Sequence, residues 1–206
     1  MRKTIFLIAI LVISAIIFYK VIAQKLPIRR GSNEWDGSGA LKQLASHEAT
    51  WQKNDEDGNG IKDYYTYDVA GLRYHVNLDG TKLQYIDKRF ADADPSVANW
   101  DSTVKPFPYL GYYFIALKKD GDGNNYNQNL AARSTGPIIA GETKIGNSTK
   151  YGFCAYPAEY DKTGIFTLIA NQTGIRYYKD LGGKPIEQWP VKEGEDPAIA
   201  GWRIVE

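Results

Sequence analysis

The residue types and spacing that most suggest chemistry lie in the stretch DEDGNGIKD. Acidic and amide side chains fall at every second position, and calcium prefers several oxygen ligands presented in this way. Positions one, three, five, seven and nine of an EF-hand loop are matched by Asp55, Asp57, Asn59, the carbonyl group of Ile61, and Asp63. The sequence therefore predicts a calcium site at these five residues.

Two neighbouring positions decide how strongly such a loop would bind. Gly60 occupies loop position six, where the turn needs a residue without a Cβ atom. Position twelve is Thr66 rather than the bidentate glutamate of an EF-hand, so we expect weak affinity, in the range of extracellular modules. The alternative interpretation is a solvated acidic turn, in which Asp and Asn side chains bond to the local backbone.

A second polar loop contains Asp120, Asp122 and Asn124. These side chains also alternate, but no acidic residues follow to complete a set of ligands. The preferred interpretation is a turn without a metal.

No linear motif in the chain predicts catalysis. His47 and His75 have no metal-binding partner at helical or strand spacing, and a Gly-x-Ser-x-Gly elbow and a phosphate-binding glycine loop are both absent from the sequence. The single cysteine, Cys154, lies in an apolar run and is expected to be a buried hydrophobe. We therefore expect a non-enzymatic protein with no catalytic residue, although a triad or carboxylate pair assembled across the fold is not visible in a linear sequence.

Two N-glycosylation sequons begin at Asn147 and Asn171, on expected turns. Because asparagine is common in this chain, such matches also arise by chance. They are kept as candidate glycosylation sites.

The N-terminal segment has the pattern of a membrane anchor or a signal peptide. Arg2 and Lys3 precede an uncharged apolar run, so the part of the chain that follows is expected to be extracytoplasmic. As an anchor, a helix over residues 5–23 would be about 28 Å long, close to the hydrocarbon thickness of roughly 30 Å. As a signal peptide, the segment would be removed before Gln24. We prefer the retained helix.

Composition and pattern predict three parts: a hydrophobic N-terminal helix over residues 1–23, a linker over 24–37, and a globular head over 38–206. A net charge of +1 gives no broad positive electrostatic field that would attract nucleic acid.

In the head, apolar residues on a helical period predict an amphipathic helix over residues 38–53. Short strands follow, including a hairpin of 72–78 and 82–88 and a later meander, and 15 tyrosines favour a sheet. The expected fold is α+β, with one face of an antiparallel sheet against the helix.

Three segments, ALKQLASHEATWQKNDEDGNGIKDYYTYDVAGL, GYYFIAL and KYGFCAYPAEYDKTGIFTLIANQTGIRYYKDLG, resemble an exported bacterial domain family of unknown function. Some members of that family resemble type IV pilins and pseudopilins. The resemblance implies a pilin-like head and self-association into a filament, and it implies no enzymatic activity. The chain lacks the leader glycine and the early glutamate of pilin precursors.

These observations predict a non-enzymatic extracytoplasmic structural protein with a calcium-stabilised loop. It would be a pilin-like filament subunit or a membrane-anchored surface protein. The alternative is a secreted binding module for a glycan or protein ligand, released by cleavage of a signal peptide. In that role, tyrosines exposed on the strands would supply contacts.

Overall fold

The computed structural model describes residues 31–56, 60–76, 82, 84–128 and 146–206. Residues 31–206 make up one compact unit. The expected N-terminal helix and residues 24–30 of the expected linker lie outside the described residues. Within the described part, no helix is long and apolar enough to cross a membrane.

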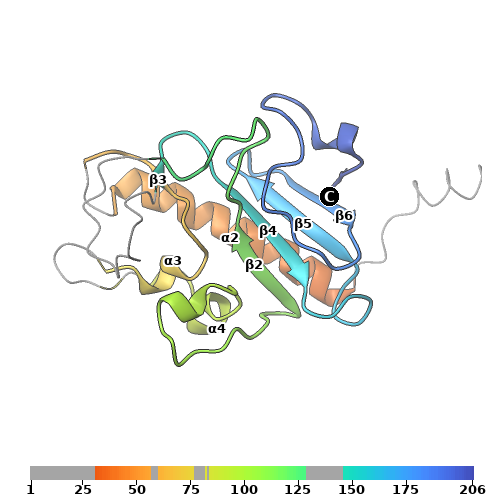
Figure 1. The fold of residues 1–206 in the computed structure, drawn as a ribbon, viewed down its shortest axis with the longest axis horizontal. Helices are drawn as coiled ribbons and strands as arrows, with labels where there is room; N and C mark the ends of the chain where they lie inside the picture. The colour runs from red at the N-terminus through yellow and green to blue at the C-terminus, as the bar shows by residue number, and fades with distance from the viewer. Residues whose placement is uncertain (1–30, 57–59, 77–81, 83, 129–145) are drawn as a thin grey trace, which may run out of the picture. The chain divides into compact units, whose positions relative to one another are not determined.

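The described residues form an α+β fold, as predicted (Figure 1). The helical elements are α2 (Ser32–Asn54), α3 (Gly71–Tyr74), α4 (Lys88–Ala91), η1 (Val97–Asn99) and η2 (Pro197–Ala200). The strands are β1 (Tyr64–Tyr65), β2 (Tyr112–Ala116), β3 (Gly146–Asn147), β4 (Gly152–Pro157), β5 (Phe166–Asn171), β6 (Arg176–Asp180) and β7 (Arg203–Ile204).

The main sheet is antiparallel, with strand order β2-β4-β5-β6-β7. Its centre is the predicted meander of β4, β5 and β6, joined by tight turns, with β2 paired to β4. Cross-strand partners such as Phe114, Ala155 and Leu168 are aligned in one row across three strands. A second, two-stranded sheet pairs β1 with β3.

Helix α2 packs on one face of the main sheet, as predicted (Figure 1). Its residues Leu41, Leu44 and Trp51 are almost fully buried, which confirms the helical period read from the sequence. The helix begins at Ser32, earlier than expected, so residues 32–37 of the expected linker are helical. Gly37, which was assigned to the linker, lies in this added part of the helix, and a Cβ atom there would lie only 3.3 Å from side chains of β2 and β5.

The opposite face of the sheet is also covered, which corrects the expectation of a one-sided sheet. Cys154, Ile169 and Tyr177 point to this face, and Trp189 and Trp202 from the C-terminal segment pack against them. The sequence of this C-terminal segment is rich in proline and has no periodicity, so it does not predict the packing. The segment is nevertheless anchored by its large aromatic side chains.

The predicted hairpin of residues 72–78 and 82–88 is wrong where the structure describes it. Residues 71–74 form the short helix α3, residues 84–87 are not in a strand, and an isolated antiparallel bridge joins Val76 to Lys82. Residues 77–81 and 83 of the hairpin lie outside the described residues. The side chain of Asp68 accepts a hydrogen bond from the Gly71 amide at 2.7 Å, which starts the helical turn. Local capping therefore outweighs the strand propensity of this stretch.

Candidate functional site

The predicted calcium loop begins directly where α2 ends. Asp55 caps the helix in a left-handed conformation, with φ of 52°, and its Oδ2 atom accepts a hydrogen bond from the Gly60 amide at 2.9 Å. Asp57 and Asn59 lie outside the described residues. Ile61 is half-buried and Asp63 is buried beside Gly146 of β3. No group of three or more His, Cys, Asp or Glu side chains in the described part of the chain is placed to hold a metal ion.

A buried glutamate next to this loop was missed by the sequence analysis. The Glu48 side chain is fully buried, and its Oε2 atom accepts a hydrogen bond from the Tyr65 amide at 2.9 Å. Burial raises the pKa of Glu48 well above the usual range, and the charge of Asp63 raises it further. The signal was available, because Glu48 shares the helical face of Leu41, Leu44 and Trp51.

Aromatic rings enclose the end of α2. Trp51 lies 4.8 Å from the Tyr65 ring and 5.1 Å from the His75 ring. Burial lowers the pKa of His75 to about 4, so this histidine is neutral at physiological pH. His47 is half-buried, with its ring 5.6 Å from that of Tyr85. Both histidines therefore pack with aromatic residues.

Two further buried carboxylates hold the segment between β1 and β2. Asp68 accepts hydrogen bonds from Gly71 N and from Trp100 Nε1, the latter at 2.6 Å. Asp94 accepts from the amides of Val69 and Ala70 at 2.6 and 3.0 Å. The Ser96 hydroxyl lies between the two carboxylates, 2.7 Å from Asp94 and 3.3 Å from Asp68. The Asp-Pro-Ser sequence was a turn signal for Asp94, whereas nothing local marked Asp68.

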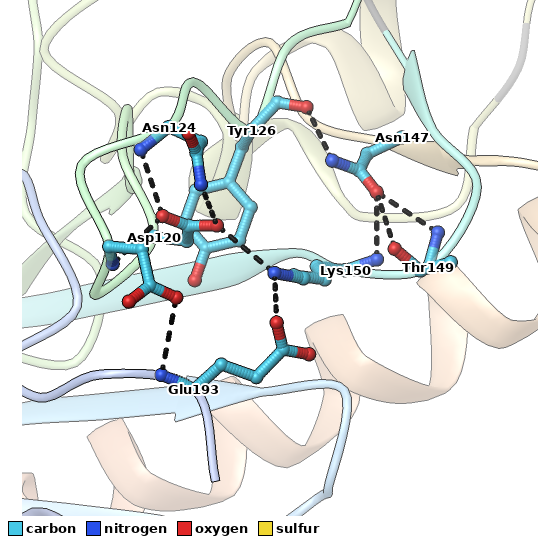
Figure 2. Close-up of polar contacts among 8 residues, drawn as sticks. Asp120, Asn124, Tyr126, Asn147, Thr149, Lys150 and Glu193 are labelled. Atoms are coloured by element: carbon cyan, nitrogen blue, oxygen red, sulfur yellow. Dashed lines mark hydrogen bonds and ion pairs between the residues drawn. The ribbon is translucent and has the colours of Figure 1, made fainter. Parts of the chain in front are cut away.

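The second polar loop is an ion-paired turn (Figure 2). Asp120 accepts hydrogen bonds from the amides of Asp122 and Asn124 at 3.0 and 2.9 Å. Lys150, between β3 and β4, binds Asp120 at 3.1 Å and Glu193 at 2.6 Å, so its ammonium group joins the loop to the C-terminal segment. Its charge helps to lower the pKa of Asp120.

Beside this network lies a cleft of about 510 Å³. Three segments enclose it: the loop that begins at Asp120, the turn between β5 and β6, and the C-terminal residues 189–197. The C-terminal segment is held in place by a hydrogen bond from Trp189 N to Lys119 O at 2.9 Å. It also crosses so close to Gly121 that a Cβ atom there would overlap the backbone of Val191. The cleft wall therefore depends on fixed backbone contacts.

The two sequons occupy different surroundings. Asn147 is buried, and its Nδ2 atom donates to Tyr126 O at 2.9 Å, while its Oδ1 atom accepts from Thr149 and Lys150 (Figure 2). A glycan would be attached through this Nδ2 atom, which is buried and already donates to Tyr126. Asn171 is nearly buried at the rim of the cleft, where its Oδ1 atom accepts from the Thr173 hydroxyl at 2.7 Å.

Cys154 is fully buried, as predicted, and burial raises the pKa of its thiol to about 12.

The protein matches no curated protein and no solved structure. One family described as "Protein of unknown function (DUF2950)" matches residues 20–205. The match extends over almost the whole head and begins within the apolar N-terminal segment. The chain belongs to this family of unknown function.

Proposed function

We propose that this chain is a non-enzymatic extracytoplasmic structural protein. Its apolar residues 5–23 would anchor it in the membrane or pack in the core of a pilin-like filament. The observation that carries the proposal is the basic pair Arg2 and Lys3 ahead of a long uncharged apolar run, followed by a separate compact unit of residues 31–206. The filament version draws on the resemblance of the three quoted segments to an exported family in which some members resemble pilins.

External proteolysis of intact cells tests the location of the head. Protease added outside should remove the epitopes of residues 31–206 while a cytoplasmic marker protein stays intact. Protection of the head until the inner membrane is lysed would contradict the proposal. Fibres that contain the protein, seen by immunogold electron microscopy, would select the filament version, and their absence would select the simple anchor.

Calcium in the loop between Asp55 and Asp63 is part of the same proposal. Both ends of the loop contribute carboxylates, and Asp63 would link the helix to β1. At a calcium concentration ten times the dissociation constant, binding would stabilise the head by about 1.4 kcal/mol, or roughly 3–6 °C in thermal midpoint.

The measurement is the thermal midpoint of the full-length chain with calcium and with excess chelator. Asp55→Asn should abolish the calcium effect, whereas Asp122→Asn, in the loop already paired by Lys150, should keep it. An identical midpoint in calcium and in chelator would reject the role of calcium.

The second candidate function is a secreted binding module. The cleft of about 510 Å³ favours this function, because its volume lies in the range of small-molecule sites, roughly 300–1,000 Å³. In this version the apolar segment would be a signal peptide removed before Gln24.

A further inference from the structure

Exposed apolar side chains gather around the N-terminal end of α2. Trp35 lies in the first turn of this helix, Leu110 shortly before β2, and Tyr160 and Ile165 in the turn between β4 and β5. The exposed fraction of these residues lies between 36% and 57%. We propose that these four side chains dock on the headgroup region of the membrane. The inference deepens the anchor version of the proposed function and rests on it.

Short contacts hold the three segments together at this end of the head. Asn33 Nδ2 donates a hydrogen bond to Thr163 O at 3.0 Å, and Glu34 Oε1 accepts one from the Ile165 amide at 2.9 Å. A Cβ atom at Gly111 would lie 2.7 Å from Asn33 Nδ2 and 3.2 Å from Thr163 Cβ. The start of α2, the β4–β5 turn and the approach to β2 therefore lie side by side (Figure 1).

The backbone at Leu110 gives a separate reason to look for a partner outside the head. Leu110 has φ of 53°, in the left-handed region that glycine and asparagine adopt more easily than leucine. Its side chain is nevertheless 40% exposed, so packing within the head gives little compensation. Residues held in such conformations are often found at functional sites, which supports a docking role for this side chain.

The length of the connecting segment favours the membrane as the surface that covers this end. Residues 24–30 separate the apolar residues 5–23 from Gly31, the N-cap of α2. Seven fully extended residues span at most about 25 Å. In an anchored chain, the start of α2 therefore lies within about 25 Å of the hydrocarbon core. The surface around the start of α2 is the part of the head that this tether keeps closest to the bilayer.

The side chains at this end suit a lipid interface. Tryptophan and tyrosine are enriched at membrane interfaces, where one part of the ring system is apolar and another is polar. The charged groups nearby are Asp36, Glu159, Asp161 and Lys162, and Lys162 pairs with Glu159 at 2.6 Å. The negative excess gives no attraction to anionic lipids, so apolar contact must drive the docking. We therefore expect docking on vesicles of zwitterionic phosphatidylcholine alone.

The test places one fluorescent label at either end of β5 in the full-length chain. Ile165→Cys lies directly before this strand, and Ile175→Cys follows the turn at its other end. The two isoleucines are similarly exposed, at 36% and 42%. The native Cys154 is fully buried, so a nitrobenzoxadiazole maleimide should label only the introduced cysteine.

The measurement is quenching of the label by lipid. Each labelled chain is reconstituted into phosphatidylcholine vesicles with and without a phosphatidylcholine that carries a nitroxide on its acyl chain. The label at residue 165 should lose at least half of its emission in the nitroxide vesicles. The label at residue 175 should lose less than a tenth. A carbonate wash before each measurement reports whether the chain is anchored.

Two further variants test the exposed leucine. Leu110→Asn removes the apolar side chain and keeps a residue that accepts the left-handed conformation, so the thermal midpoint of the head should not fall. It should reduce the quenching at residue 165 by at least half. Ile199→Asn, at a 70% exposed isoleucine of η2, should leave the quenching at residue 165 unchanged.

The outcomes separate the docking surface from the anchor. A chain that resists carbonate but shows no quenching at residue 165 would overturn the docking and preserve the anchor. Release of the chain by carbonate would overturn both. Equal quenching at residues 165 and 175 would overturn this end as the docking surface. A blue-shifted emission at residue 165 without quenching, lost when the chain is diluted in lipid, would show that a second copy covers this end and would overturn the lipid surface.

Discussion

Asp68 is a carboxylate whose surroundings oppose its charge. Burial, and next the charge of Asp94, raise the pKa of Asp68 to about 7 in the folded chain, although hydrogen bonds from Trp100, Gly71 and Tyr65 act in the other direction. In an unfolded chain the pKa of an aspartate is about 3.9. Between these two values the folded state holds a proton that the unfolded state has lost.

This difference predicts how stability depends on pH. The contribution of Asp68 is fully present below about pH 4 and is lost as the pH rises through about 7. We therefore expect the free energy of unfolding to fall between about pH 5 and 7, by at most about 1.4 kcal/mol per pH unit from this group. Urea unfolding at a series of pH values measures the slope.

Two variants isolate the group responsible. Asp68→Asn should make the slope less steep, whatever its overall stability, because one titrating group is gone. Glu48 and Asp94, whose pKa values are also raised, keep the rest of the slope. Asp101→Asn should leave the slope unchanged, because hydrogen bonds from Thr103 lower the pKa of Asp101 and it stays ionised over this range. Equal slopes in the wild type and in Asp68→Asn would contradict this account of Asp68.

Residue-level prediction succeeded where a short pattern was sufficient. The burial of Cys154 follows from its apolar neighbours, and the turn at Asp120 follows from alternating Asp, Gly and Asn residues. The burial of Glu48 and Asp68 was missed because each depends on a partner distant in sequence or on a tertiary environment. A polar residue on an apolar helical face is the sign to look for.

Helix α2 contains two glycines, although glycine has a low helix propensity. Gly37 and Gly39 lie within its N-terminal half, where glycine costs up to about 1 kcal/mol relative to alanine. A Cβ atom at Gly37 would press against Leu168 and Tyr112 at 3.3 Å, whereas one at Gly39 would meet no heavy atom within 4 Å. Only Gly37 therefore has a packing role.

The two glycines should respond in opposite ways to substitution. Gly39→Ala should raise the free energy of unfolding by about 0.5–1 kcal/mol, through helix propensity. Gly37→Val should lower it by about 1–3 kcal/mol, because the larger side chain separates α2 from the sheet. Chemical denaturation of both variants measures the changes, and a stabilised Gly37→Val would show that the helix does not pack this closely.

At the level of elements, periodicity determined what could be predicted. The α2 face, β2 and the meander of β4 to β6 follow from apolar spacing and turn residues. The hairpin after residue 71 failed, because the Asp68 carboxylate starts a helical turn there. The packing of the C-terminal segment was not predicted, for another reason: its tryptophans are spaced irregularly, and only the sheet face that they cover gives them a role.

The whole molecule combines a compact head with a segment whose chemistry suits a membrane. The α+β class and the helix on an antiparallel sheet were predicted from the sequence and are confirmed. Membership in a family of unknown function adds a shared domain over residues 20–205 and no activity. The proposed membrane anchor or filament core therefore requires that residues 5–23 are retained in the mature protein.

The most direct test is the intact mass, with N-terminal sequence, of the native protein recovered separately from membranes and from the culture medium. The proposal predicts a chain that retains residues 5–23 and sediments with membranes or fibres. A mature chain that begins at Gln24 and is found free in the medium would contradict it.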